Sequence, residues 1–293
     1  MAADAIPVLP PVVRGTVQQL QIPSCLLTPN DLRRLYRTLE QKAAEAADRQ
    51  VATLTLQAGQ TQEQLDALRN QVRTALTLVL RVQTGSGEWV GGTTVDPLSD
   101  EQLPSHIVKI ELDSSFLYRS QFHLAPNNTF TVTLDFSRPG ILDMSNVPVA
   151  NVSVAIISGL DATWAHGLHN ELITFFRERP TKRGWLHFSQ SHSVLVILVG
   201  FPLSFDAVYH LAPLMRKAAL PDALAVALYV YVVLVVLFLF RITFNYARWA
   251  FPKVEINAPR QHVATAHRLA ISAVALMIVS ALVRAGLKLL GIG

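Results

Sequence analysis

The polar residues with the clearest chemical meaning in this 293-residue chain are Asp206 and His210, because they stand inside an apolar stretch. A separation of four residues places both side chains on one face of a helix, one turn apart. A charged side chain at the centre of a bilayer costs at least about 2.5 to 3.5 kcal/mol, so such residues usually face protein or water. The pair could line a proton or ion path, or bond to another helix across an oligomer interface. Alternatively, the apolar span ends near Phe205 and the pair lies among the outer lipid headgroups.

Other reactive residues do not form a complete motif. His166 and His169 could share a metal ion, but the His-Glu-x-x-His pattern of metalloproteases is absent, and surface histidines are the simpler interpretation. The glycines of GSGEWVGG lie between two strand-like runs, and no Gly-Lys-Ser/Thr follows them. We therefore interpret these glycines as turn residues and predict neither a metal site nor a cofactor.

Catalysis in the N-terminal part of the chain remains an alternative. The candidate residues are His123, Asp135, Ser137 and Asp143. Their spacing implies no specific reaction, and the motifs of serine, cysteine, kinase and metal-hydrolase enzymes are missing. A membrane-anchored enzyme would require Asp135, Asp143 and His123 to converge in a cleft.

The composition indicates two regions with different solvents. Only 16% of the residues are charged and 51% are hydrophobic, whereas soluble domains carry about 25% charged residues. The last hundred residues are dominated by Leu, Val, Ala and Ile, while the preceding part mixes residue types as a soluble domain does. Much of the basic excess lies beside apolar segments, which argues against nucleic-acid binding. Because Cys25 is the single cysteine, no intrachain disulfide can form.

Residues 193–290 are predicted to form a bundle of about three transmembrane helices. The uncharged run 223–240 would span about 27 Å as a helix, close to the roughly 30 Å thickness of the hydrocarbon core. The first span contains Pro202 and Pro213, so we expect it to be kinked, with a re-entrant or interfacial segment as the alternative. The spans are expected at about residues 193–215, 221–246 and 267–290.

Basic residues predict the orientation of these spans. Four basic residues precede the first span and five stand between the second and third, but the first loop has only Arg216 and Lys217. By the positive-inside rule, the N-terminal domain and the second loop face the cytosol. The C-terminus then lies outside, and we expect a multi-pass protein of the inner (cytoplasmic) membrane.

Aromatic and basic residues mark the end of the second span. They are expected to anchor the helix at the membrane surface, since such side chains favour that position. The alternation of charged and apolar residues at 253–256 also permits a short strand that docks on the soluble domain. The predicted interface anchors are Arg248, Trp249, Phe251 and Lys253.

Residues 16–180 are predicted to form a cytosolic α+β domain, an antiparallel sheet with flanking helices, after an extended or disordered arm at 1–15. A capping box at Thr28 and Asp31 predicts a helix over 29–47. The residues of 51–57 alternate between apolar and polar, which predicts a strand. A second short helix is expected at 60–71.

The following segments predict strands. A turn at 85–87 predicts one β-hairpin, and residues 106–124 and 128–137 predict a second, joined by the turn residues 125–128. A last strand is expected at 151–159. With helices on its flanks, such a sheet belongs to the α+β class.

A helix beginning after Asp161 and ending before Pro180 is predicted to join the domain to the membrane region. It carries an apolar stripe that we expect to lie in a core, with a groove for a partner as the alternative. The basic residues of 181–192 form a juxtamembrane linker. The residues of the stripe are Trp164, Leu168, Leu172, Phe175 and Phe176.

These patterns predict an integral membrane protein whose cytosolic domain binds a cytosolic protein or small ligand. We expect it to contact the lipid bilayer, to self-associate, and to act as an oligomeric sensor or scaffold. The alternative is an oligomeric pore or channel gated by the soluble domain. It ranks second because a lasting aqueous pore needs polar faces on several helices, and the first helix alone supplies them.

Overall fold

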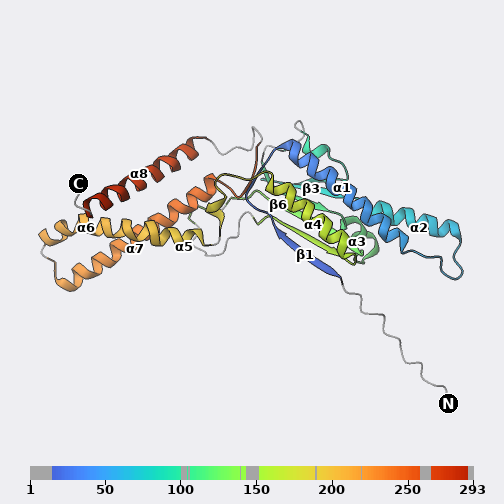
Figure 1. Ribbon diagram of the computed structural model, residues 1–293, viewed down its shortest axis with the longest axis horizontal. Coiled ribbons are helices and arrows are strands. Elements are labelled where there is room, and N and C mark those ends of the chain that lie inside the picture. Colours follow the sequence, from blue (N-terminus) through green and yellow to red (C-terminus); the bar gives the residue numbers. More distant parts are fainter. Residues whose placement is uncertain are drawn as a thin grey trace, which may run out of the picture.

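The computed structural model describes residues 15–99, 104, 106–138, 140–142, 152–188, 190–218, 220–257 and 265–289. An α+β domain stands at one end of an elongated molecule, and a group of long helices extends from it (Figure 1). The predicted arm at 1–15 lies outside the described residues except for Gly15.

A six-stranded antiparallel sheet forms the centre of the domain, with strand order β1-β7-β6-β5-β3-β4. Along β6, every second residue is buried and the others are half-buried, so one face of the sheet lies on the core. The predicted α+β class is confirmed. The strands are β1 Thr16–Gln21, β3 Val79–Thr84, β4 Trp89–Gly92, β5 Ile107–Asp113, β6 Asn128–Asp135 and β7 Val154–Gly159.

Two long helices of the domain, α1 and α4, share one core with the inward side chains of the sheet. The predicted capping box is present at the start of α1, where the Thr28 backbone N–H donates to the Asp31 carboxylate at 2.9 Å. Asp161 caps α4 by accepting a hydrogen bond from the Trp164 backbone N–H at 3.1 Å. The domain helices are α1 Pro29–Ala52, α2 Gln62–Ala75, α3 Phe116–Phe122 and α4 Ala162–Arg177.

The strand predicted at 51–57 is wrong, because α1 continues to Ala52 and a turn and loop then lead to α2. Val51 is buried in a small second core together with side chains of α2 and α3. Packing between these helices therefore outweighs the local alternation of apolar and polar residues, which is a weak signal on its own.

For the second predicted hairpin, the pairing of the two strands is confirmed, but the predicted turn between them is wrong. Strands β5 and β6 pair as antiparallel neighbours, but the helix α3 stands between them. The buried Asp113 carboxylate accepts hydrogen bonds from the Ser115 backbone N–H at 2.8 Å and from Arg119 at 2.6 Å. These bonds stabilise a helical turn directly after β5. The hairpin predicted at 85–87 joins β3 to β4 as expected, and Gly87 has φ 87°, which favours glycine.

The C-terminal third is helical. Among the described residues, two helices are long and apolar enough to cross a membrane: the continuous helix Ser191–Lys217, and α7. The apolar helix Thr265–Ser280, which overlaps the span predicted at 267–290, is shorter than this, so the third span stays a prediction. The elements are α5 Ser191–Leu195, the π-helical turn η3 Val196–Gly200, α6 Phe201–Lys217, α7 Asp222–Ala250 and α8 Thr265–Leu289.

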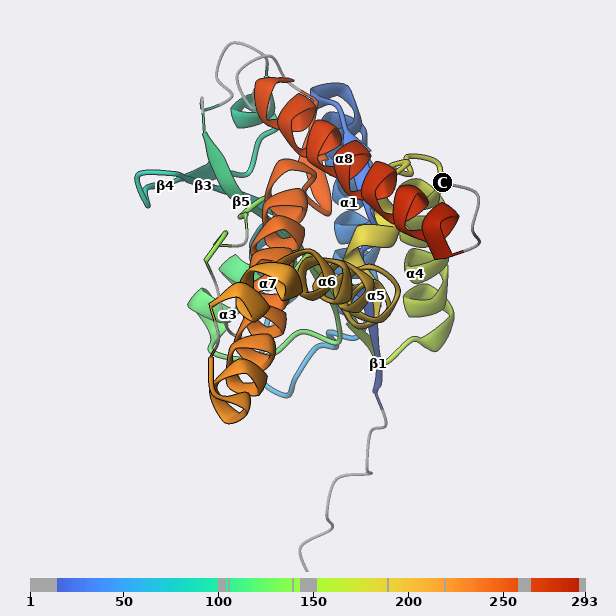
Figure 2. The same ribbon diagram turned by 90° about the vertical axis from the view of Figure 1, so that its left-hand side faces the viewer.

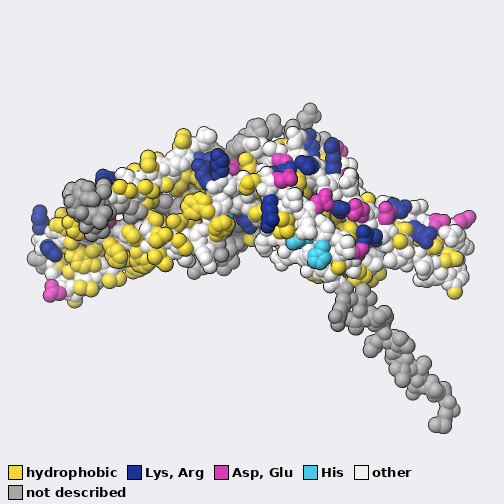
Figure 3. Space-filling view, in the orientation of Figure 1, with side chains coloured by type: hydrophobic (Ala, Val, Ile, Leu, Met, Phe, Trp, Pro, Cys, Tyr) yellow, Lys and Arg dark blue, Asp and Glu magenta, His cyan; other side chains and the backbone are white. Residues whose placement is uncertain are grey.

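The helices pack as a hairpin with a third helix across it. α6 and α7 lie antiparallel, and Figure 2 shows α8 crossing this pair at an angle. Hydrophobic side chains cover the face of the helical region in view, and Lys and Arg side chains gather where this region meets the domain (Figure 3). This distribution is typical of a helical hairpin in a bilayer with a basic margin at the headgroups.

Candidate functional site

The helices are connected to the domain by a short strand that follows α7. This strand, β8 (Val254–Ile256), pairs in parallel with β2 (Cys25–Leu27). The Cys25 backbone N–H donates to the Lys253 carbonyl at 3.0 Å, and the Asn257 N–H donates to the Leu27 carbonyl at 2.7 Å. Val254 and Ile256 are buried in the main core of the domain. The docked strand that the sequence permits as an alternative is therefore present.

Side-chain hydrogen bonds surround this strand pair. The His187 Nε2 atom lies 2.7 Å from the Phe251 carbonyl oxygen, and Arg248 donates to the Leu186 carbonyl at 3.1 Å. Burial lowers the pKa of His187 to about 4, although the hydrogen bond to Phe251 raises it. His187 is therefore neutral at pH 7, and its Nε2–H donates to the carbonyl. The end of α7 is fixed to the segment before α5.

Arg179 connects the end of α4 to the same place. Its Nε atom donates to the Asp31 carboxylate at 2.6 Å, and its guanidinium lies 4.0 Å from the centre of the Phe175 ring. Burial raises the pKa of Asp31, but the hydrogen bonds from Thr28 and Arg179 outweigh this effect, and the net pKa is lowered. The Arg179 carbonyl accepts from the Leu26 N–H in β2 at 3.1 Å. Arg179, just after α4, therefore links α1 to β2, the strand that holds β8.

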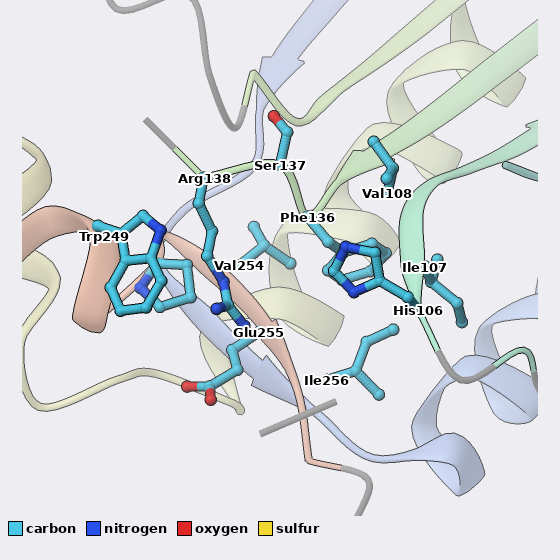
Figure 4. Close-up of a pocket in the computed structure, with 11 residues that line it drawn as sticks. His106, Ile107, Val108, Phe136, Ser137, Arg138, Trp249, Val254, Glu255 and Ile256 are labelled. Carbon is cyan, nitrogen blue, oxygen red and sulfur yellow. The ribbon is translucent and has the colours of Figure 1, made fainter. Parts of the chain in front are cut away.

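A cavity of about 380 Å³ lies between the sheet and β8. In Figure 4 the Arg138 side chain extends beside Trp249 toward Glu255. The Arg138 guanidinium lies 5.1 Å from the centre of the Trp249 ring, which is a cation–π distance. The lining residues come from β5, the end of β6, the end of α7 and β8. They are His106, Ile107, Val108, Phe136, Ser137, Arg138, Trp249, Pro252, Val254, Glu255 and Ile256.

Charged side chains lie in the lining of this cavity and beside it. Arg268, in the first turn of α8, forms an ion pair with the Glu255 carboxylate. Burial lowers the pKa of Arg138, the Glu255 carboxylate raises it, and the Arg268 guanidinium lowers it. Glu255 is the one acidic side chain among the described lining residues, and it interacts with both Arg138 and Arg268.

The four predicted interface anchors all lie at this junction. Trp249 stacks on Tyr246 with ring centres 5.9 Å apart, and the Arg183 guanidinium lies 3.8 Å from the centre of the Phe251 ring. Burial lowers the pKa of Lys253. These residues contact the domain as well as the helix end, and their role as membrane anchors stays a prediction. The fourth anchor, Arg248, forms the hydrogen bond to Leu186 given above.

The apolar stripe of α4 is part of the main core. Its five residues are buried together with side chains of α1 and the sheet. The Phe130 and Trp164 rings lie 6.4 Å apart, which places Trp164 over the centre of the sheet. The stripe therefore holds the domain together. The buried residues are Trp164, Leu168, Leu172, Phe175 and Phe176.

Asp206 and His210 lie on one face of α6, as their spacing predicts. The Asp206 carboxylate and the His210 Nε2 atom are 3.6 Å apart, and the side chains are 34% and 59% exposed. His210 is therefore largely exposed, whereas Asp206 is half-buried. The described residues contain no group of three or more His, Cys, Asp or Glu side chains that could hold a metal ion.

Among the described candidates for catalysis, Asp135 and Ser137 lie within hydrogen-bond distance of each other. His123 caps the end of α3, before β6 begins, whereas Asp135 is the last residue of β6, so the whole strand lies between them in the chain. Asp135 accepts hydrogen bonds from the Ser137 and Val152 backbone N–H groups at 2.8 and 2.9 Å, which occupy both of its oxygens. Asp143 lies outside the described residues.

Sequence reasoning did not single out the cavity residues Arg138 and His106, or Arg268, which pairs with Glu255 of the lining. Arg138 follows β6, His106 precedes β5, and Arg268 belongs to α8, so they are distant in the chain. No local spacing pattern connects residues that only the fold brings together. The aromatic and basic character around Trp249 was the available signal, and it pointed to the membrane surface.

No model of a known protein family matches the chain, and comparisons with curated proteins and with solved structures give no match either. The junction between the domain and the helices is therefore the feature from which a function can be inferred.

Proposed function

We propose that the chain is an integral membrane sensor or scaffold of the cytoplasmic membrane. In this proposal, the cytosolic α+β domain binds a partner or ligand and transmits its state to the membrane helices. The observation that supports it is the strand β8, which follows α7 and lies in the core of the domain. A flexible linker would let the domain move independently of the helices.

The coupling has a physical basis in the buried side chains of β8. Fully burying a Val or Ile side chain stabilises the folded state by about 1.5 to 3 kcal/mol, so releasing Val254 and Ile256 is costly. Arg179 connects β2 to α1 and to the end of α4. A conformational change that shifts β2 should therefore also shift β8 and the end of α7, because no flexible linker separates them. This connection favours a transmitting domain over a passive tether.

The open face of the sheet offers a surface for a cytosolic partner. Arg81 forms an ion pair with Glu111 at 2.7 Å, and its guanidinium lies 4.4 Å from the Phe116 ring and 5.3 Å from the Trp89 ring. Exposed aromatic and arginine side chains are enriched where proteins bind one another. Lys109 lies 6.0 Å from the same Trp89 ring.

Dye retention in liposomes that contain the full chain tests this proposal. A sensor or scaffold leaves the bilayer sealed, so an encapsulated dye stays inside. Steady leakage or single-channel conductance from the purified chain would contradict the proposal and support a channel. Protease digestion of the same liposomes reports which side the domain occupies.

An oligomeric pore gated by the domain is the second candidate. The observation that favours it is the Asp206–His210 pair, because exposed ionisable side chains in a membrane helix call for protein or water around them. Self-association through α6 would also cover the pair and would keep the bilayer sealed. The leakage assay distinguishes these two outcomes.

A further inference from the structure

The Asp206–His210 pair lies near the middle of a helix that is long enough to cross a membrane. The helix Ser191–Lys217 has 27 residues, so Ser204 stands at its centre and Asp206 follows two residues later. At about 1.5 Å per residue, Asp206 is about 3 Å and His210 about 9 Å from this centre. The hydrocarbon core extends roughly 15 Å to either side of its middle. When the helix is centred in a bilayer, both side chains therefore lie at the depth of the lipid tails.

The two side chains do not satisfy each other's hydrogen-bonding groups. The Asp206 carboxylate and the His210 Nε2 atom are 3.6 Å apart, which is beyond hydrogen-bond distance. The His210 side chain is 59% exposed, so it remains open to whatever surrounds α6. Ionisable side chains at this depth usually face protein or water, because lipid tails offer them no partner.

Two prolines lie on the same side of the helix as this pair. Pro202 precedes Asp206 by four residues, and Pro213 follows His210 by three, which are spacings of one helical face. Proline has no N–H, so Pro213 cannot donate to the Tyr209 carbonyl one turn earlier. A backbone carbonyl released in this way needs another donor at membrane depth. We call Pro202, Asp206, His210 and Pro213 the polar stripe of α6.

The polar stripe points away from the contact between α6 and α7. Gly200 lies so close to α7 that an added Cβ would be 3.1 Å from a Leu237 side-chain atom. Ser204 is fully buried, and its hydroxyl donates to the Gly200 carbonyl at 2.8 Å. At about 100° per residue, Asp206 is about 160° around the helix from Ser204. The stripe is therefore available to a partner outside the hairpin.

A second copy of the chain carries the complementary groups at the required depth. Two copies inserted in the same orientation hold their acids at one level of the bilayer and their histidines at another. A two-fold axis along the membrane normal brings the two stripes together and makes every contact occur twice. The His210 Nε2–H of one copy can then donate to the Asp206 carboxylate of the other, and the reverse bond forms as well.

We infer that the polar stripe of α6 is a self-association surface, on which two copies of the chain pair through reciprocal Asp206–His210 hydrogen bonds. Hydrogen bonds between polar side chains of neighbouring helices stabilise helix pairs in membranes. The inference rests on the proposed function for the membrane position of α6, and it specifies a partner for the proposed sensor or scaffold. Because β8 fixes α7 to the domain, pairing of the α6 helices would connect two cytosolic domains.

Disulfide cross-linking of the full chain in liposomes tests this surface. Tyr209→Cys places a thiol beside the stripe, at a side chain that is 70% exposed, and the buried Cys25 of the unaltered chain gives the background. The matched control is Leu234→Cys, near the middle of α7, where the side chain is 58% exposed. With a mild oxidant, Tyr209→Cys should form at least about ten times more cross-linked dimer than Leu234→Cys, since the helix pair holds its thiols together. Equal cross-linking of the two variants would overturn the inference.

Two further changes, made in the Tyr209→Cys chain, test the hydrogen bonds themselves. His210→Phe removes the donor and keeps an apolar ring suited to the membrane, so the lipid-to-protein ratio at which half the chain is cross-linked should fall about tenfold. Asp206→His combined with His210→Asp exchanges the two groups and keeps one acid and one base in each stripe. This double change should preserve cross-linking. Unchanged cross-linking in His210→Phe, or an exchanged pair that associates no better than His210→Phe, would overturn the inference.

The same liposomes separate this inference from the proposed function. Selective cross-linking in liposomes that leak dye would refute the proposed sensor or scaffold and leave the self-association surface standing. Sealed liposomes without selective cross-linking would do the reverse. In native membranes, cross-linking of Tyr209→Cys to a chain of another mass, and not to a second copy, would also overturn the inference.

Discussion

The connection through β8 can be tested by replacing a single buried side chain. Ile256 is 3% exposed and lies in the main core, so Ile256→Ala removes buried methyl and methylene groups. Such a change costs about 2 to 5 kcal/mol. If this cost falls on the docked strand, the equilibrium constant for its release rises at least about 30-fold, since 1.4 kcal/mol is a factor of ten.

Cys25 provides the assay, because it is the single cysteine and it pairs with Val254 of β8. The thiol is buried, and burial raises its pKa to about 12, although Lys253 and Arg179 lower it. A thiolate is the species that reacts with alkylating reagents, so native Cys25 should be inert. Alkylation at native pH, followed by mass spectrometry, should then be at least about 30-fold faster in Ile256→Ala.

Two control variants decide between local release and general unfolding. Leu26→Ala alters the outward-facing residue of β2, which is 37% exposed, and should change the rate by about twofold or less. Leu76→Ala weakens the second core, which contains neither Cys25 nor Ile256, and it should leave the alkylation rate unchanged while it lowers the unfolding midpoint. If Ile256→Ala and Leu76→Ala accelerate alkylation equally, β8 is not released separately from the domain, and the proposed coupling is refuted.

Three further predictions concern pH, charge and membrane contacts. His187 gains a proton near pH 6.5 in the unfolded state but only near pH 4 in the folded state. The free energy of unfolding should therefore fall by up to about 3 kcal/mol as the pH drops from about 6.5 to about 4. Urea titrations at several pH values check this, and an identical slope in His187→Gln would contradict it. Arg179→Met should lower the free energy of unfolding by about 1.5 to 3 kcal/mol, because it removes a hydrogen bond to the Asp31 carboxylate; a double-mutant cycle with Asp31→Asn that shows no coupling would refute the pairing. Asp206→Asn should reduce the oligomeric fraction in detergent, and unchanged assembly together with unchanged conductance would remove this residue from any interface or ion path.

Local signals in the sequence determined several elements. The capping box at Thr28 set the start of α1, Asp161 set the start of α4, and glycines set the turn between β3 and β4. The uncharged run made α7 long and apolar enough to cross a membrane. In each case the interactions that stabilise the element are made between residues close together in the chain. A short window of sequence is therefore enough to predict it.

The tertiary structure decided the rest. The residues near Val51 are helical because side chains of α2 and α3 pack against them. Hydrogen bonds to the Asp113 carboxylate stabilise α3 between the two strands that were predicted to form a simple hairpin. The position of β8 beside β2, and of Arg138 beside Trp249, depends on segments that are distant in the chain. Such contacts form only when the core of the domain encloses Val254 and Ile256, and the free energy of that burial is a property of the whole fold.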